Sequence, residues 1–265
     1  MNSSSSIPVL MYHRVGDTHN EWERKYCVSA RRFAEHMNLL AAKGWRAITL
    51  CDFFSWLDSG ASLPEKSFLL TFDDGFHGVY EYAAPVLTAL NWPATVFLVS
   101  TLIGKRDIWC AAENPNGATY PLMDAAQIRE LSGRGFTFHS HTRSHADLPK
   151  TDAATLRDEL AGSRDELQQL LGAPVDYLAY PFGRYDARVM AAAQEAGYLA
   201  AFSTQPGFNR LGIERFKLRR LDIFGTDSAP ALLRKIQLGS NDGSVGNGIR
   251  YFANRVRARL GLQTR

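Results

Sequence analysis

The chain has 265 residues, of which 45% are hydrophobic and 22% are charged, a composition that excludes a disordered protein and is typical of a globular fold. Its 30 basic and 27 acidic residues leave a formal charge of +3, which is too balanced to indicate nucleic-acid binding, and no nucleic-acid motif is present. The three cysteines, Cys27, Cys51 and Cys110, are widely spaced, so we expect neither a disulfide framework nor a cysteine zinc site.

The N-terminal segment MNSSSSIPVL has no basic residue and no apolar stretch of signal-peptide length. No run of about 18 apolar residues could span a bilayer. We therefore expect a cytoplasmic protein with reduced cysteines, although removal of a targeting segment would leave the same pattern.

Short apolar runs alternate along the chain with longer segments of helical period, which is the pattern of βαβ units around a parallel sheet. One helical stripe covers residues 33–41 and another covers residues 156–171, and each is followed by a glycine, Gly44 or Gly172. No repeat or low-complexity linker divides the chain, so we predict one domain of roughly seven or eight βα units. The predicted strands are residues 8–12, 46–50, 68–72, 94–99, 136–140, 177–180, 199–203 and 217–224.

Two irregular stretches interrupt this pattern. Residues 104–121 form the longer one, which we expect to be a rim of the site and not a linker. Residues 239–248 form the other and separate an arginine-rich segment without acidic residues. We therefore divide the chain into a domain of residues 1–240 and a basic tail of residues 241–265.

The basic tail is expected to be helical, because its apolar residues Ile249, Phe252, Val256 and Leu260 approximate one helical face. Such a helix could make peripheral contact with an anionic membrane surface. A terminal helix that packs one face on the domain is the favoured alternative.

Polar clusters follow several of the predicted strands. Asp73 and Asp74 follow the third strand, residues 139–145 close the fifth, residues 180–185 follow the sixth, and His13 follows the first. Parallel α/β folds carry their active sites beyond the C-terminal ends of the strands. We therefore expect these side chains to lie at the same end of the sheet.

The segment HSHTRSH places His141 and His145 four residues apart, a spacing at which two imidazoles on one helical turn can bind the same ion. His139 could compete, because residues two apart in a strand share a face. The alternative is a hydrogen-bonded surface turn, which the position at a strand end and the nearby aspartates disfavour.

An aspartate pair suits a metal hydrolase, because one carboxylate can bind the ion while the other accepts a proton from the attacking water. Taken alone, this signal is weak, since adjacent aspartates before a glycine are also common in turns and at helix N-termini. Gly75 is expected in either case, because the chain must turn sharply there.

The strings TFDDG at residues 71–75 and SHTRSH at residues 140–145 resemble the polysaccharide deacetylase family, which comprises carbohydrate esterases of family 4 that remove N-acetyl groups from amino sugars. PATVFLV at residues 93–99 and AYPFGRY at residues 179–185 extend the resemblance over most of the chain. It implies an α/β fold, a distorted (β/α) barrel of about seven strands, and a divalent ion, commonly zinc, with cobalt, nickel or manganese as alternatives. By position in the motifs, Asp73 would be the general base, and the metal ligands would be Asp74, His141 and His145.

AYPFG resembles the family's third motif, RxPYG, which lines the groove and provides a backbone N–H for the oxyanion. Phe182 occupies the tyrosine position and can still serve, because a backbone donor needs no particular side chain. Ala179 replaces the arginine that normally holds the base aspartate. Arg219 or Arg220 is the nearest substitute, and we assign the role to Arg220. The residues expected at the substrate or the oxyanion are Tyr180, Pro181, Phe182 and Gly183.

The family's final motif, LxxH, supplies the histidine that protonates the leaving amine, but no histidine follows His145. The string LMYH occurs instead at residues 10–13, and a closed barrel would place this first strand beside the last. The chain therefore resembles a circularly permuted member, similar to the poly-N-acetylglucosamine deacetylases, with His13 as general acid and Asp222 as a candidate partner of its imidazole. The alternative for His13 is a buried histidine at a strand end.

Together, these residues predict a metal-dependent hydrolase that removes N-acetyl groups from an amino-sugar glycan and releases acetate and a free amine. The substrate would be an N-acetylated oligo- or polysaccharide or a lipid-linked precursor. A metal-dependent amidase on a non-sugar amide would use the same residues, whereas a catalytically silent carbohydrate-binding relative is disfavoured because the four motif residues are all present. The oligomeric state is not predicted. The aromatic residues expected at the rim are Phe76, Trp109, Tyr180, Phe182 and Tyr185.

Overall fold

The computed structural model describes residues 6–250. Its main sheet contains seven parallel strands in the order β10-β1-β5-β6-β7-β8-β9, and β4 pairs with the first half of β5. The curved sheet closes on itself because Phe202 of β9 bridges Leu218, just before β10. The strands are β1 (Val9–Tyr12), β4 (Arg46–Ile48), β5 (Ser67–Phe72), β6 (Ala94–Leu98), β7 (Phe136–Ser140), β8 (Tyr177–Ala179), β9 (Ala200–Phe202) and β10 (Leu221–Asp222), with a separate short pair, β2 (Arg14–Val15) and β3 (Cys27–Val28).

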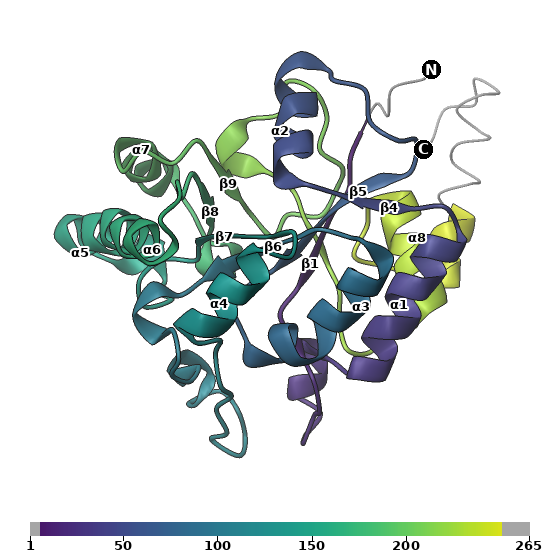
Figure 1. Ribbon diagram of the computed structural model, residues 1–265, viewed down its shortest axis with the longest axis horizontal. Helices are drawn as coiled ribbons and strands as arrows, with labels where there is room; N and C mark the ends of the chain where they lie inside the picture. The colour runs from purple at the N-terminus through teal and green to yellow at the C-terminus, as the bar shows by residue number, and fades with distance from the viewer. Residues whose placement is uncertain (1–5, 251–265) are drawn as a thin grey trace.

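Helices surround this barrel (Figure 1). One group, α1, α3 and α8, packs together on one side, and another, α5, α6 and α7, lies on a different side, whereas α2 covers one end of the barrel. The loop of residues 104–121 projects from the opposite end. The helices are α1 (Ala30–Ala42), α2 (Leu50–Ser59), α3 (Ala84–Leu90), α4 (Ala125–Ser132), α5 (Ala153–Arg157), α6 (Ser163–Leu171), α7 (Ala187–Glu195) and α8 (Ala229–Leu238).

Both predicted helical stripes are confirmed. The stripe of residues 33–41 lies within α1, which begins after Ser29, whose side chain accepts a hydrogen bond from the backbone N–H of Arg32. The stripe of residues 156–171 extends through α5, a π-helical turn and α6. This helical run ends at Gly172, whose φ of 63° is a left-handed conformation that favours glycine.

Side chains of the strands alternate between the outside and the inside of the barrel. Leu70 and Phe72 face outward into the core beneath the helices, whereas Val9, Leu69 and Phe97 face inward and form a core with α2. This inner core fills the end of the barrel that α2 covers. Polar residues can therefore occupy the inward positions at the opposite end, where the parallel strands terminate.

The strand predicted for residues 46–50 was too long, because α2 begins at Leu50. The side chain of Thr49 accepts from the N–H of Asp52 at 3.0 Å, and the carboxylate of Asp52 accepts from the N–H of Thr49 at 3.2 Å. This reciprocal capping box starts the helix. The strand predicted for residues 217–224 is also shorter, because Arg215–Lys217 forms a 3₁₀ turn before β10.

The irregular stretch predicted for residues 239–248 ends early, since residues 245–250 are helical. Most of the predicted basic tail, residues 251–265, lies outside the described residues, so its helical structure and the division of the chain at residue 240 stay predictions. Between residues 6 and 250, no helix combines the length and the apolar character needed to cross a bilayer.

Candidate active site

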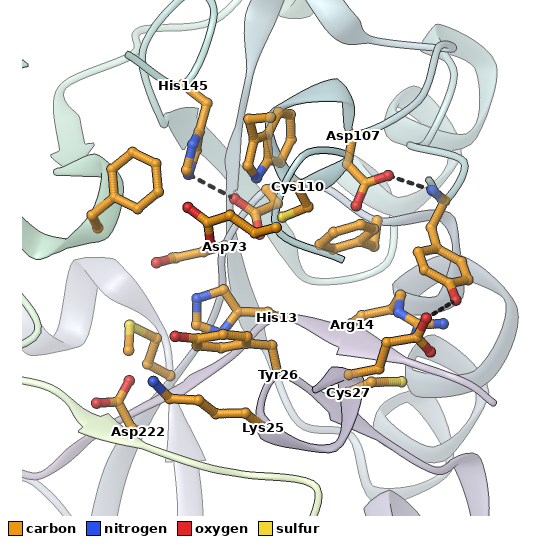
Figure 2. A pocket seen from close by; sticks show the side chains of 18 of the residues that line it. His13, Arg14, Lys25, Tyr26, Cys27, Asp73, Asp107, Cys110, His145 and Asp222 are labelled. Atoms are coloured by element: carbon orange, nitrogen blue, oxygen red, sulfur yellow. Dashed lines mark hydrogen bonds and ion pairs between the residues drawn. The ribbon is translucent and has the colours of Figure 1, made fainter. Parts of the chain in front are cut away.

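The site residues predicted from the sequence come from the ends of neighbouring strands. The inward row that contains Leu69 and Thr71 leads to Asp73 after β5, and the inward row of β1 leads to His13. These side chains and those of the histidine motif line a cavity of about 340 Å³. Figure 2 shows His13, Asp73 and His145 pointing into this cavity. The structure therefore brings together side chains from distant parts of the chain.

A carboxylate and two imidazoles converge at one side of the cavity. Asp74 Oδ1 lies 3.4 Å from His141 Nε2 and 3.4 Å from His145 Nε2, and all three residues are buried. Neither contact has hydrogen-bond geometry, so Oδ1 is a buried oxygen without a hydrogen-bond partner among the described residues. One carboxylate oxygen and two imidazole nitrogens are the donors that a catalytic zinc site uses, with a further position open. The three residues therefore fit a divalent ion.

The two imidazoles are held in different ways. His141 Nδ1 lies 2.8 Å from the backbone carbonyl of Ala179, which directs Nε2 toward Asp74, as is usual for metal-ligating histidines. The ring of His145 stacks on Trp109 at a centroid distance of 4.4 Å and meets the edge of Phe182 at 4.6 Å. Trp109 belongs to the loop of residues 104–121, so the prediction that this loop forms a rim of the site is confirmed.

The backbone of this site is strained. Of the five non-glycine residues with positive φ between residues 6 and 250, four lie here: Asp74 (72°), Thr142 (67°), His145 (64°) and Phe182 (58°). Each such conformation costs about 1–3 kcal/mol and persists where the surrounding structure holds it. Beside Asp74, Gly75 has a φ of 79°, and a Cβ there would lie 2.6 Å from the side chain of Leu98. The predicted requirement for glycine is confirmed.

Asp73 faces a different partner from its neighbour. Both of its carboxylate oxygens accept from Arg220, at 2.6 and 2.8 Å, and the Arg220 side chain is fully buried. Arg220 Nε also donates to the carbonyl of Ser203 at 3.0 Å. Burial alone would raise the pKa of Asp73, but Arg220 and His141 outweigh it and lower the pKa. Of the two arginines considered from the sequence, Arg219 points away and donates to Pro206 O.

His13 lines the cavity near Asp73, and Tyr26 lies below it in the view of Figure 2. The rings of His13 and Tyr26 meet edge to face at 5.4 Å. Asp222 is on β10, next to β1, and burial raises its pKa although the nearby His13 opposes this shift. No hydrogen bond joins His13 and Asp222 among residues 6–250, and the Asp222 carboxylate accepts instead from Asn241 Nδ2 at 2.9 Å.

The turn after β8 lines the cavity and contains one backbone N–H without an acceptor among the described residues. The N–H of Tyr180 donates to Phe202 O at 3.1 Å, and the N–H of Gly183 donates to Tyr180 O at 2.9 Å. Pro181 has no N–H. The N–H of Phe182 therefore remains as the free donor of residues 180–183. The Tyr180 side chain is buried, and its hydroxyl donates to Phe216 O at 3.2 Å.

The sequence also matches a model of a known protein family. A family model described as polysaccharide deacetylase matches residues 60–201, which is more than half of the chain. The chain belongs to the polysaccharide deacetylase family. The resemblance inferred from the TFDDG and SHTRSH strings is confirmed.

Curated relatives of this chain include the YxkH protein of Bacillus subtilis, which is 27% identical over 203 residues that cover 77% of this chain and 66% of that protein, slightly less than two thirds of its length. The poly-β-1,6-N-acetyl-D-glucosamine N-deacetylase of Staphylococcus epidermidis is 24% identical over 251 residues, which cover 87% of this chain and 83% of that protein.

Solved structures support the fold of this chain. The deacetylase PplD of Streptococcus pyogenes aligns with a TM-score of 0.75 at 22% identity and covers 88% of this chain and 99% of that one. IcaB from Ammonifex degensii aligns with a TM-score of 0.71 at 25% identity and covers 86% of this chain and 95% of that one. The predicted distorted (β/α) barrel is confirmed.

His139, which sequence reasoning left open as a competing ligand, lies outside the cluster of Asp74, His141 and His145. It occupies the inward row one position deeper than His141. The centre of its ring lies 4.8 Å from the ring centre of Tyr177 and 6.4 Å from that of Phe97. Burial lowers its pKa to about 3. His139 therefore belongs to the inner core, as a neutral side chain.

Sequence reasoning missed a polar cluster that joins two loops at the mouth of the cavity, and we call Arg14, Glu23, Asn114 and Tyr120 the Glu23 cluster. The buried Glu23 carboxylate accepts from Arg14 at 2.9 Å, from Asn114 Nδ2 at 3.1 Å and from the hydroxyl of Tyr120. The Arg14 guanidinium lies 3.5 Å from the centre of the Tyr120 ring. The partners are too far apart in the chain for a local pattern to predict them.

Proposed function

We propose that this protein is a metal-dependent deacetylase that removes N-acetyl groups from an amino-sugar glycan and releases acetate and a free amine. The observation that carries the proposal is the convergence of Asp74, His141 and His145 on one point beside an aspartate that Arg220 keeps ionised. Membership of the polysaccharide deacetylase family supports the same reaction class.

Asp74, His141 and His145 would hold the ion, for which we propose zinc, with cobalt, nickel or manganese as alternatives. A divalent ion held there would supply Lewis acidity toward the acetyl carbonyl and would make water more acidic. The stacking of Trp109 on His145 covers one side of this point.

Asp73 is proposed as the general base. Its lowered pKa keeps the carboxylate ionised at neutral pH, so it can accept a proton as the water oxygen attacks the acetyl carbon. The N–H of Phe182 would donate to the oxygen on which negative charge develops. His13, near Asp73 in the cavity, is proposed as the general acid that protonates the nitrogen as the carbon–nitrogen bond breaks. The products are then acetate and a free amine.

The substrate is proposed to be an N-acetylated oligo- or polysaccharide. The name of the Staphylococcus epidermidis relative specifies poly-β-1,6-N-acetyl-D-glucosamine, and the cavity of this chain is lined by aromatic side chains that suit the apolar faces of sugar rings. These aromatic residues include Trp22, Tyr26, Trp109, Tyr120 and Phe182.

A substrate linked to a membrane lipid is a variant of this proposal, motivated by the arginine-rich residues 249–265. Pelleting with anionic liposomes would test it, with the full chain and with a chain that lacks these residues. Equal pelleting of the two chains would remove the proposed role of the tail.

The test of the reaction is acetate release from a panel of N-acetylated saccharides and non-sugar N-acetyl amides, before and after chelation. We expect release from saccharides, loss after chelation and recovery when zinc is returned. Release only from non-sugar amides would favour the alternative, a metal-dependent amidase. Release from no compound by metal-loaded protein would favour a silent carbohydrate-binding relative.

A further inference from the structure

A second cavity adjoins the proposed catalytic one. It is a groove of about 900 Å³ beside the N-terminus of α7, and its lining includes Asp147, Lys150, Arg184, Tyr185 and Lys217. Gly183 lines both cavities. The groove therefore begins where the catalytic cavity ends, and we call it the α7 groove.

The ridge between the two cavities is fixed in place. Phe182 has a φ of 58° and Gly183 a φ of 67°, and a Cβ on Gly183 would collide with the side chain of Thr204. The Phe182 side chain is 45% exposed, and the Arg184 guanidinium lies 5.2 Å from the centre of its ring. The exposed ring of Phe182 therefore lies on a ridge of constrained backbone between the two cavities.

The α7 groove contains an aromatic residue, Tyr185, whose ring packs on a buried neighbour. Tyr185 lines the groove and stacks on Tyr180 at a centroid distance of 4.8 Å and an angle of 21°. Tyr180 is fully buried. Because one ring is anchored in the core, the other presents a supported aromatic surface, which suits the C–H face of a sugar.

The charges of the α7 groove favour a neutral, polar ligand. Three cations, Lys150, Arg184 and Lys217, face two carboxylates, so there is little excess charge to attract a polyanion. Both carboxylates are already engaged: Asp147 accepts from Lys150 and Arg184, and Asp186 accepts from the N-terminus of α7. The three cations are engaged as well, Lys150 and Arg184 with Asp147 and Lys217 with Glu214. An ammonium has three N–H donors and a guanidinium has five, so further N–H groups remain that match the hydroxyl and carbonyl oxygens of an N-acetylated glycan.

We propose that the α7 groove binds a further sugar of the same glycan chain, on the side of the reacting sugar that crosses Phe182. This inference rests on the proposed deacetylase function and makes the preferred substrate an oligosaccharide or polymer in place of a single amino sugar. Arg184 and Tyr185 are then specificity-determining residues, because they contact a sugar that does not react.

The test compares the zinc-loaded full chain on N-acetylglucosamine disaccharide, tetrasaccharide and hexasaccharide, in β-1,4- and β-1,6-linked forms. We expect kcat/KM to rise with chain length. In Arg184→Ala and in Tyr185→Leu, which keeps apolar bulk over Tyr180, the ratio of kcat/KM for the hexasaccharide to that for the disaccharide should fall about tenfold, which corresponds to roughly 1.4 kcal/mol.

Arg134→Ala is the matched control, because Arg134 is also an exposed arginine in an ion pair, with Glu130, and its side chain is 53% exposed against 55% for Arg184. It lines neither cavity, so the ratio should not change. No rise with chain length in the wild type, or an equal loss on every substrate in the groove variants, would overturn the proposal.

Binding separates this inference from the proposed reaction. In protein that carries Asp73→Asn, calorimetry should show hexasaccharide binding that Arg184→Ala weakens about tenfold. Such a result would support sugar binding in the α7 groove even if no assay detected acetate release. Failure of acetate release would reject only the proposed reaction. Absence of hexasaccharide binding, or binding that Arg184→Ala does not weaken, would contradict the proposed sugar site in the α7 groove.

Discussion

Asp73 and Asp74 are neighbours in the chain, but their carboxylates face different partners. The left-handed conformation of Asp74 turns its side chain toward the two histidines, while Asp73 continues the inward row of β5 and meets Arg220. The sequence alone could not decide which carboxylate does which task without the family resemblance. The conformation at residue 74 provides the physical reason for two separate tasks.

Replacing the buried guanidinium should change both the pH dependence and the stability. In Arg220→Met, the buried carboxylate of Asp73 would lose its cationic partner, so the pKa of Asp73 should rise. The acid limb of the pH profile of kcat/KM should then move to higher pH. Because the wild-type pKa is lowered, Asp73 contributes stability above its unfolded pKa that is lost as the pH falls through the folded value. Urea unfolding at neutral pH should show a loss of about 3–5 kcal/mol.

Arg219→Met is the control for this variant, since the exposed guanidinium of Arg219 donates to the carbonyl of Pro206, whereas the Asp73 carboxylate accepts from Arg220. It should leave both measurements near wild type. An unshifted acid limb in Arg220→Met would contradict the role given to Arg220.

If His13 protonates the leaving nitrogen, its importance should depend on the leaving group. His13→Ala should retain metal and lose about 10²-fold or more in turnover of an N-acetyl amide. Hydrolysis of 4-nitrophenyl acetate should suffer much less, because nitrophenolate leaves without a proton. Equal losses on the two substrates, or amide turnover at the wild-type rate, would show that His13 is not the general acid.

At the scale of elements, strands were easier to predict than helices. Apolar runs located the main strands to within a few residues, because a strand buried on both sides leaves a nearly continuous apolar signal. α2 was missed since its first residue, Leu50, continued the apolar run of β4, and only the capping box at Thr49 marks the change. The choice of Arg220 over Arg219 also had no local signal behind it, because the register of β10 decides which of the two points inward.

The Glu23 cluster holds the loop of residues 104–121 in place as one wall of the cavity. Removal of the Tyr120 hydroxyl group tests this role. Tyr120→Phe removes the bond to the buried Glu23, so the free energy of unfolding should fall by about 1–3 kcal/mol and KM should rise more than kcat falls. Tyr80→Phe is the matched control, because its hydroxyl donates to the exposed Glu130 at 2.8 Å. Equal effects of Tyr120→Phe and Tyr80→Phe on stability and kinetics would show that the Glu23 cluster does not hold the loop in place.

At the scale of the whole molecule, barrel closure determines the site. Phe202 bridges Leu218, and Leu221 then pairs with Leu10 of β1, so a histidine near the N-terminus lies beside residues from the end of the domain. The sequence predicted this neighbourhood through the resemblance to permuted family members. It could not predict the α7 groove, because no single segment contains its lining.

Binding of an ion to residues from two distant segments should stabilise the entire fold. Zinc at about 100 times its dissociation constant would add about 2.7 kcal/mol, so calorimetry should show a higher Tm when zinc is returned to chelated protein. His145→Ala should abolish the shift. His77→Ala should retain it, because His77 pairs with Glu81 outside the ligand cluster. The same shift in His145→Ala would place the ion elsewhere.

The most direct test of the proposed site measures bound metal and acetate release on the same protein samples. In Asp73→Asn, we predict full metal occupancy with turnover lowered by about 10²-fold or more, and in Asp74→Ala we predict loss of both. Full occupancy and normal turnover in Asp74→Ala, or wild-type turnover in Asp73→Asn, would contradict the division of tasks between these two carboxylates.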